Sequence, residues 1–167
     1  MANDNKNLQA ARNLKDDEFY TTYESIVEEL SHYSHHFRGK VILCNCDDPF
    51  ESNFSKYFLK NFNVFGLARL ICTSYKGSNV LGTQLELFDD NNNALHNRHG
   101  YVLDVKHIGK GKDELSDKYI TEWLRCSCAI KKLKGDGDFR SKECLAYLQQ
   151  ADIIVTNPPF SLFKELV

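Results

Sequence analysis

The sequence predicts an α/β fold built on a parallel sheet, and a few segments carry that prediction. Residues 40–46 and 67–73 are short apolar runs of the kind that form strands covered on both faces. Between them, residues 52–62 place apolar side chains at helical spacing, so this part of the chain predicts a right-handed parallel crossover unit. A third apolar run, 152–156, follows a helical segment at 141–150 and predicts a further buried strand.

The amino-terminal part predicts an arm followed by one helix. Residues 1–15 are polar and are expected to form an arm, and the short segment 16–21 that follows is acidic and aromatic. Apolar residues then recur at helical spacing over 22–37, which predicts an amphipathic helix. Thr21 and Glu24 have the spacing of a capping box at its start.

The middle of the chain predicts an insertion. Residues 76–112 are rich in Gly, Asn, Asp and His and contain two strand-like pieces, 83–88 and 101–108, which we expect to form a hairpin. Apolar residues from 115 to 124 then predict a short helix. A basic run at 131–134 precedes a glycine-rich turn.

Composition excludes some classes of protein. Of the 167 residues, 42% are apolar and 26% charged, which suffices for a core and excludes a disordered chain. The first residues hold no hydrophobic block and no run approaches a membrane span, so we expect a cytoplasmic protein. With 21 basic and 23 acidic residues, the chain lacks the basic excess common in proteins that hold DNA by its phosphates.

The six cysteines are expected to be reduced thiols that mostly pack in the core. Cys44 and Cys46 are alternate residues of an apolar run and would share one buried face of a strand. Two Cys-x-Cys pairs and several histidines leave zinc as an alternative, but structural zinc sites favour wider cysteine spacing. No metal is therefore expected.

The tetrapeptide Asn157-Pro158-Pro159-Phe160 is the strongest indication of a functional site in the sequence, because it directly follows the predicted strand 152–156. Open α/β folds bind ligands at the carboxyl ends of their strands. The Asn157 side-chain oxygen and the Pro158 carbonyl can accept the two hydrogens of an exocyclic amine, while Phe160 stacks on its ring. The alternative is a strand-terminating Pro-Pro turn with no chemical role.

At this point the chain resembles the EcoRI-type adenine-specific DNA methyltransferases. Asn157-Pro158-Pro159-Phe160 resembles their catalytic motif, and residues 17–21 resemble the aromatic segment that borders the methyl donor. Residues 41–54 resemble their S-adenosylmethionine loop, and residues 136–139 resemble the segment near the donor's adenine. The resemblance implies these cofactor-binding residues: Phe19, Tyr20, Thr21, Asp47, Asp48, Pro49, Asp138 and Phe139.

Two positions depart from the family pattern. The usual Gly-x-Gly of the donor loop is replaced within residues 51–54, and the acidic residue expected after the second strand is replaced by Thr73-Ser74-Tyr75. Capping of a helix start is the alternative role for Asp138 and for one of Asp47 and Asp48. Core packing is the alternative for Phe19 and Tyr20.

The resemblance implies a Rossmann-like methyltransferase fold, with residues 16–167 as the amino-terminal part of its catalytic domain. About four strands of the sheet fit in the chain, and a second chain or a carboxyl-terminal half would complete it. The implied reaction is methyl transfer from S-adenosylmethionine to a flipped adenine in double-stranded DNA, in a restriction–modification or phage system. The alternatives are RNA or protein glutamine as acceptor, or a non-catalytic or split remnant that binds the donor or a partner chain.

Overall fold

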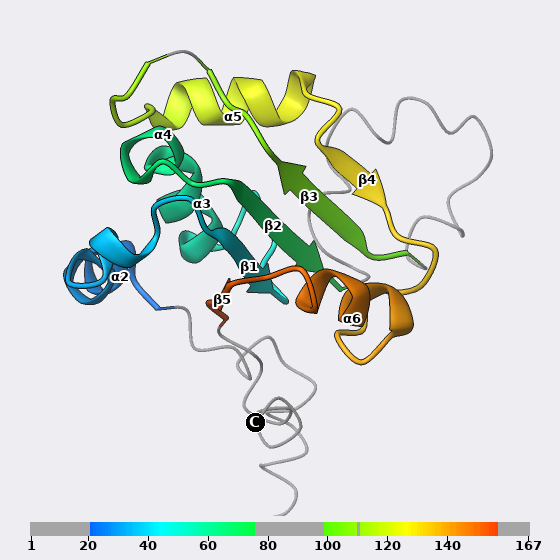
Figure 1. Ribbon diagram of the computed structural model, residues 1–167. Helices are drawn as coiled ribbons and strands as arrows, with labels where there is room; N and C mark the ends of the chain where they lie inside the picture. Colours follow the sequence, from blue (N-terminus) through cyan, green and yellow to red (C-terminus); the bar gives the residue numbers. More distant parts are fainter. Residues whose placement is uncertain (1–20, 76–98, 110, 157–167) are drawn as a thin grey trace, which may run out of the picture.

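The computed structural model describes residues 21–75, 99–109 and 111–156, which form a mixed α/β structure around one sheet (Figure 1). The sheet has five strands in the order β4-β3-β2-β1-β5. β1 pairs in parallel with β2 and β5, whereas β3 is antiparallel to both β2 and β4. Four strands therefore run in one direction in the described residues, and their carboxyl ends meet at one edge of the sheet.

The predicted parallel unit is confirmed, with β1 (Val41–Asn45) and β2 (Arg69–Ser74) as its strands. Helix α3 (Asn53–Lys60) lies between them, and α4 (Phe62–Phe65) follows it. Gly66 ends α4 in the left-handed conformation, at a φ of 61°, which a glycine adopts without a steric penalty.

The first described helix is shorter than the sequence predicts. Helix α2 (Tyr23–Ser31) is followed by a 3₁₀ turn at Ser34–His36. Its cap is Thr22, whose side chain accepts from the Ser25 backbone N–H, so the capping box predicted for Thr21 and Glu24 is wrong by one residue.

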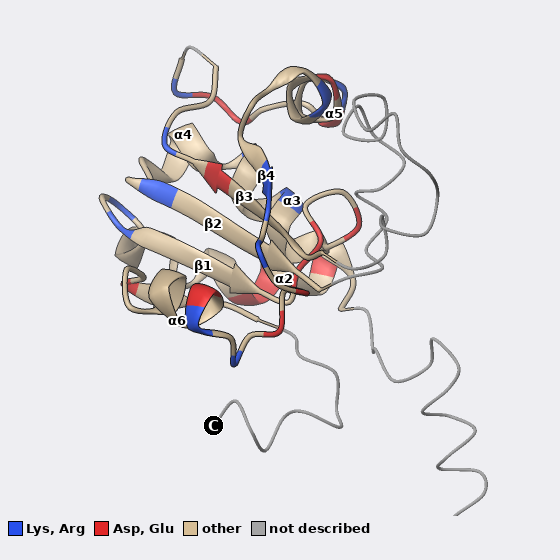
Figure 2. Ribbon diagram, turned by 90° about the vertical axis from the view of Figure 1, so that its right-hand side faces the viewer, with Lys and Arg blue, Asp and Glu red and all other residues tan. Residues whose placement is uncertain are grey.

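The second half of the predicted insertion belongs to the main sheet. β3 (Tyr101–Val105) has β2 on one side and β4 (Ile130–Lys132) on the other, rather than lying in a separate hairpin. The other expected strand, 83–88, lies outside the described residues. β4 was not predicted as a strand, because only three residues pair and two of them are the exposed lysines that Figure 2 shows in blue along β4.

The remaining elements are α5 (Asp117–Cys126), α6 (Lys142–Leu148) and β5 (Ile153–Ile154). One large apolar cluster joins α2, α3, α4 and α5 to one face of the sheet, and a smaller cluster joins α6 to the other face. The sheet therefore lies between two helical layers, with β4 and β5 at its opposite edges (Figure 1).

A charged contact fixes β3 against β2 on the α6 face. Arg69 donates from Nε to Asp104 Oδ1 at 2.6 Å and from Nη2 to Asp104 Oδ2 at 2.8 Å. Its Nη1 donates to Gln150 Oε1 at 2.7 Å, just beyond α6. The Arg69 hydrogen bond lowers the pKa of the Asp104 carboxyl below its usual value. One side chain thus connects two antiparallel strands and the end of a helix.

Two of the three apolar-run cysteines pack as the sequence predicts. Cys44 and Cys72 face each other across β1 and β2 and are fully buried, and burial raises the pKa of the Cys44 thiol. Cys46 differs from the expectation, because β1 ends at Asn45 and Cys46 adopts a left-handed φ of 65°. Its side chain is only half-buried and does not share the buried face of Cys44.

Candidate functional site

The candidate site lies at the edge of the sheet where the parallel strands end. Of the predicted site residues, the structure describes these: Thr21, Asp47, Asp48, Pro49, Asp138 and Phe139. The rest lie outside the described residues: Phe19, Tyr20, Asn157, Pro158, Pro159 and Phe160. Asp47, Asp48 and Pro49 follow β1, and Asp138 and Phe139 follow Gly137, which lies against the end of β2. Thr21 contacts the start of α3 instead.

Asp47 supports the start of the helix that follows β1. Its side chain is buried, and its Oδ1 accepts a 2.6 Å hydrogen bond from the Ser52 hydroxyl. The Ser52 oxygen in turn accepts from the Ser55 backbone N–H and caps α3. Ser52 is therefore the N-cap, and Asp47 holds it in place.

Asp48 organises the turn between β1 and α3. Its Oδ1 accepts from the backbone N–H groups of Phe50 at 2.7 Å and Glu51 at 3.3 Å. Its carbonyl oxygen accepts from the Ser52 N–H at 2.8 Å. Both carboxylates therefore stabilise the start of α3 through local hydrogen bonds, as the capping role expected for one of them suggests. The N-cap residue itself is Ser52. Pro49, inside this turn, is buried.

Thr21 joins the same region through its backbone. The Asn53 side-chain amide donates to the Thr21 carbonyl oxygen at 2.9 Å. Asn53 is the first residue of α3, next to the Ser52 cap. The Thr21 carbonyl therefore lies beside the start of α3.

A close approach of two glycines places the 136–139 segment against the end of β2. A Cβ on Gly100 would lie 2.6 Å from the Ser74 carbonyl oxygen, and a Cβ on Gly137 would overlap that same oxygen. Gly137 also has a φ of 81°, which favours glycine. Backbone hydrogen bonds from Gly100 N to Gly135 O and from Leu133 N to Gly100 O hold the two segments together.

Asp138 is bound to its own loop. Its carboxylate accepts from the Arg140 backbone N–H at 2.8 Å and forms a 2.6 Å ion pair with Arg140 Nη2. The hydrogen bond from the Arg140 side chain lowers the pKa of the Asp138 carboxyl. The predicted capping role is partly correct, because Asp138 stabilises the turn, but Ser141 caps α6. Phe139 is buried, with the Arg140 guanidinium 5.4 Å from its ring centre.

A polar cluster at the same edge, with Asn45 and Thr73 buried and Thr156 half-buried, was not predicted from the sequence. Thr73 Oγ1 donates to Asn45 Oδ1 at 2.7 Å and accepts from the Cys46 backbone N–H at 3.4 Å. Thr156 Oγ1 donates to the Asn45 carbonyl oxygen. An Asn and a Thr at the ends of apolar runs are the only sequence signal for this cluster, because its geometry depends on which strands are neighbours.

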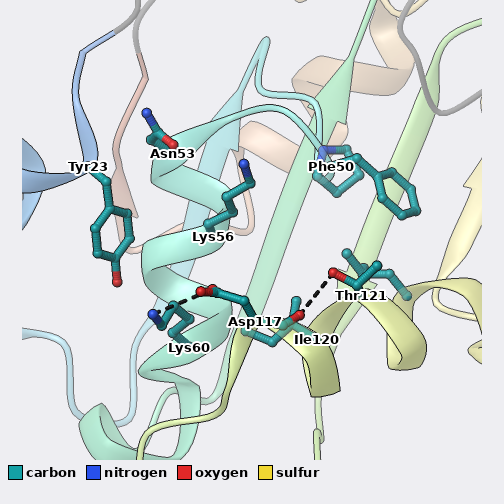
Figure 3. Close-up of a pocket in the computed structure, with 10 residues that line it drawn as sticks. Tyr23, Phe50, Asn53, Lys56, Lys60, Asp117, Ile120 and Thr121 are labelled. Carbon is teal, nitrogen blue, oxygen red and sulfur yellow. Dashed lines mark hydrogen bonds and ion pairs between the residues drawn. The ribbon is translucent and has the colours of Figure 1, made fainter.

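A separate pocket of about 420 Å³ lies between α3 and α5. Figure 3 shows Asn53, Lys56 and Lys60 along one face of α3, opposite Asp117 and Thr121 of α5. Pro49 is the predicted site residue that lines it.

Lys60 forms ion pairs at the base of this pocket. Its Nζ lies 3.4 Å from Asp117 Oδ1, 3.3 Å from Glu114 Oε1 and 5.1 Å from the centre of the Tyr23 ring. Burial by itself would lower the pKa of Lys60, but Tyr23, Glu114 and Asp117 raise it above its usual value. The Lys60 charge is therefore balanced by two nearby carboxylates.

Residues 21–75, 99–109 and 111–156 contain no group of three or more His, Cys, Asp or Glu side chains arranged to hold a metal ion. None of the helices in this part of the chain has the length and apolar character needed to cross a bilayer.

Comparison of the sequence with known proteins connects the chain to one family. Residues 7–167 match the family model described as "Adenine-specific methyltransferase EcoRI". The chain is 42% identical over 161 residues to the Type II methyltransferase M.EcoRI of Escherichia coli, covering 96% of this chain and 44% of that protein. It is 36% identical over 157 residues to the Type II methyltransferase M.MpnI of Mycoplasma pneumoniae, covering 94% of this chain and 38% of that protein.

The chain thus spans less than half the length of these curated relatives. No solved structure shows a significant match. The family match covers the loop after β1, the segment 136–139 and the Asn157-Pro158-Pro159-Phe160 tetrapeptide. The chain therefore belongs to the EcoRI family of adenine-specific methyltransferases.

Proposed function

We propose that this chain carries the donor-binding and catalytic segments of an adenine-specific DNA methyltransferase with a Rossmann-like fold. The observation that supports this most directly is that the loop after β1, the segment 136–139 and Thr156 lie at one edge of the sheet. The loop with Asp47 and Asp48 follows β1, the segment 136–139 lies against the end of β2, and Asn157 comes directly after Thr156, which is bonded to β1. The named relatives are Type II methyltransferases, which favours DNA as the substrate.

The residues at this edge suit S-adenosylmethionine, which supplies an electrophilic methyl group when bound. Asp47 and Asp48 place negative charge at the turn after β1, where it favours the donor's ammonium group. Glycines at positions 100 and 137 leave no side chain between the end of β2 and the segment 136–139. Asp138 and Phe139 then border the donor's adenine, with Phe19, Tyr20, Thr21 and Pro49 completing this side of the site.

The second half of the proposal concerns the target base. A flipped adenine would place its amine between the Asn157 side-chain oxygen and the Pro158 carbonyl oxygen, with Phe160 stacked on its ring. Two accepted hydrogen bonds keep the nitrogen lone pair available for attack, and the prolines keep the loop rigid. Catalysis is then mainly positioning of the two reactants.

The test is a methyl-incorporation assay with radiolabelled S-adenosylmethionine and full-length protein. Mixed-sequence duplex DNA, RNA and protein serve as acceptors in parallel. We expect label in adenine of duplex DNA, and a loss of at least about a hundredfold in Asn157→Ala with donor affinity retained. Label in RNA or in protein glutamine would reassign the substrate, and donor binding without transfer to any acceptor would indicate a non-catalytic protein.

Donor binding is tested separately by calorimetry on Asp48→Ala. Loss of the carboxylate removes a charge near the donor and two backbone contacts of the turn, so we expect affinity to fall by about tenfold or more. The exposed Asp113→Asn is the matched control and should bind as wild type. Unchanged affinity in Asp48→Ala would remove this turn from the donor site.

A further inference from the structure

The polar cluster of Thr73, Asn45 and Thr156 joins three neighbouring parallel strands at their carboxyl ends. Asn45 ends β1, Thr73 lies opposite it in β2, and Thr156 follows β5 on the other side of β1. The Asn45 side chain is bonded to Thr73 and its carbonyl oxygen to Thr156. A single residue of β1, the middle one of these three strands, is thus held from both sides.

The position of these residues along the chain gives the contacts a functional meaning. Asn45 comes immediately before Cys46, Asp47 and Asp48, which begin the proposed donor loop. Thr156 comes immediately before Asn157, which begins the proposed base-binding loop. The contact between Asn45 and Thr156 therefore joins the two residues that directly precede these loops, although the two are far apart in the sequence.

The backbone at Cys46 needs such support. Cys46 has a φ of 65°, and among the described residues it is the only residue other than glycine with a positive φ. Such backbone conformations persist where surrounding contacts hold them. The Thr73 hydroxyl accepts from the Cys46 N–H and so fixes the peptide at the start of the donor loop. Asn45 is 5% exposed and Thr73 is 1% exposed, so water cannot replace these contacts easily.

We propose that Thr73 and Thr156 are positioning residues that act through Asn45 to hold the donor loop and the base-binding loop in a fixed relative position. This inference rests on the proposed function, which assigns the donor to one loop and the target base to the other. Neither hydroxyl needs to touch a reactant. Each of them instead sets the distance between the methyl group and the attacking amine, on which transfer depends steeply.

The test compares Thr73→Val, Thr156→Val and the double variant in the full-length protein. Valine keeps the shape of threonine and removes the hydroxyl. Donor affinity is measured by calorimetry, and single-turnover methyl transfer to duplex DNA is measured at saturating donor. We expect each substitution to weaken donor binding about fivefold and to slow transfer about tenfold. The double variant should lose less than the product of the two single losses.

The informative result is the donor affinity of Thr156→Val, because Thr156 lies beside the base-binding loop. A change there shows that the contact reaches the donor loop through Asn45. Thr156→Ser retains the hydroxyl and should restore both constants, whereas a purely steric role would not be rescued by the smaller side chain. Ser31→Ala removes a hydroxyl that is bonded within α2, and it serves as a control that should change neither constant.

Some outcomes overturn the inference. If wild type methylates DNA but Thr156→Val keeps wild-type donor affinity and rate, the positioning role is wrong and the proposed function stands. The same holds if the losses of the two single variants multiply in the double variant. If wild type neither binds the donor nor transfers a methyl group, the proposed function fails, and this inference fails with it.

Discussion

Gly137 shows how a single residue type decides the shape of the candidate site. Its φ is 81°, and a Cβ there would overlap the Ser74 carbonyl oxygen. The segment 136–139 can therefore reach the end of β2 only while position 137 has no side chain. The same close approach keeps the Asp138 turn beside the sheet.

We predict that Gly137→Ala lowers the free energy of unfolding by about 3 kcal/mol, because it combines positive φ with a backbone clash. Gly135→Ala is the matched control, since no atom lies within 4 Å of its added Cβ. Urea unfolding followed by circular dichroism measures both. Equal stability of the two variants would show that the segment 136–139 can move away from β2 without cost.

The caps of α3 and α5 offer a second comparison at this scale. Ser52 and Ser116 both cap a helix, but Ser52 also donates to the buried Asp47 carboxylate. We predict a loss of about 1 kcal/mol for Ser116→Ala and about 2 kcal/mol for Ser52→Ala, since only the latter removes a hydrogen bond to a buried charge. Thermal unfolding compares the two. A smaller loss for Ser52→Ala than for Ser116→Ala would contradict the role given to Asp47.

Sequence patterns located the loop after β1 and the segment 136–139, because motifs depend only on neighbouring residues. The cluster of Asn45, Thr73 and Thr156 could not be predicted in this way. It requires Asn45 to lie opposite Thr73 in parallel register, and register is a property of the assembled sheet. Single polar residues at the ends of apolar runs carry no information about their partners.

At the scale of the elements, β3 is the main departure from a purely parallel sheet. It lies between β2 and β4 and runs opposite to both. The two-pronged contact from Arg69 to Asp104 fixes it to β2, and the side chains of this ion pair are only 16% and 19% exposed. Replacing only one member of such an ion pair lowers the stability of the fold, because the other charge is left without its partner.

We predict that Asp104→Asn lowers the free energy of unfolding by about 2 kcal/mol at neutral pH. The folded pKa of Asp104 is below its usual value, so its contribution is complete above the ordinary carboxyl pKa of about 4 and is lost as the pH falls through the folded pKa. The stability difference between wild type and Asp104→Asn should therefore shrink in acid.

Urea titrations at a series of pH values check this, with Asp113→Asn as the control for removing an exposed carboxylate. A difference that stays constant into strong acid would mean that the carboxylate charge contributes nothing.

Elements were predictable from the sequence where they are long and patterned. β1, α3, β2, α5 and α6 follow apolar spacing, and their boundaries agree within a few residues. β4 has three residues and two exposed lysines, so it carries no strand pattern of its own. β4 is a strand because it pairs with β3, and this pairing depends on the tertiary structure rather than on the local sequence.

At the scale of the whole molecule, β5 lies at the edge of the sheet, and β1 is its neighbour. Within residues 21–75, 99–109 and 111–156, no strand pairs with its other side. Ile154 is 48% exposed there. An exposed apolar edge is a template for association with another chain.

We predict that a polypeptide of residues 1–167 alone associates in solution and does not methylate DNA. Ile154→Lys should reduce this association, because a charge on an edge strand opposes pairing with a second copy. Val64→Lys changes a similarly exposed apolar residue on α4 and should leave association unchanged. Light scattering coupled to gel filtration measures the mass, and a wild-type monomer with adenine-methylating activity would contradict the prediction.

The pairing of β1 with β5 also has a consequence for synthesis on the ribosome. Contacts across this pair join residues 111 positions apart, as from the Val41 N–H to the Asp152 carboxylate. A ribosome adds roughly 5–20 residues each second, so one side of β1 waits on the order of ten seconds for its partner to emerge. During that interval the nascent chain presents an open strand of Val, Ile and Leu, and we expect it to be a target for chaperones that bind extended apolar segments.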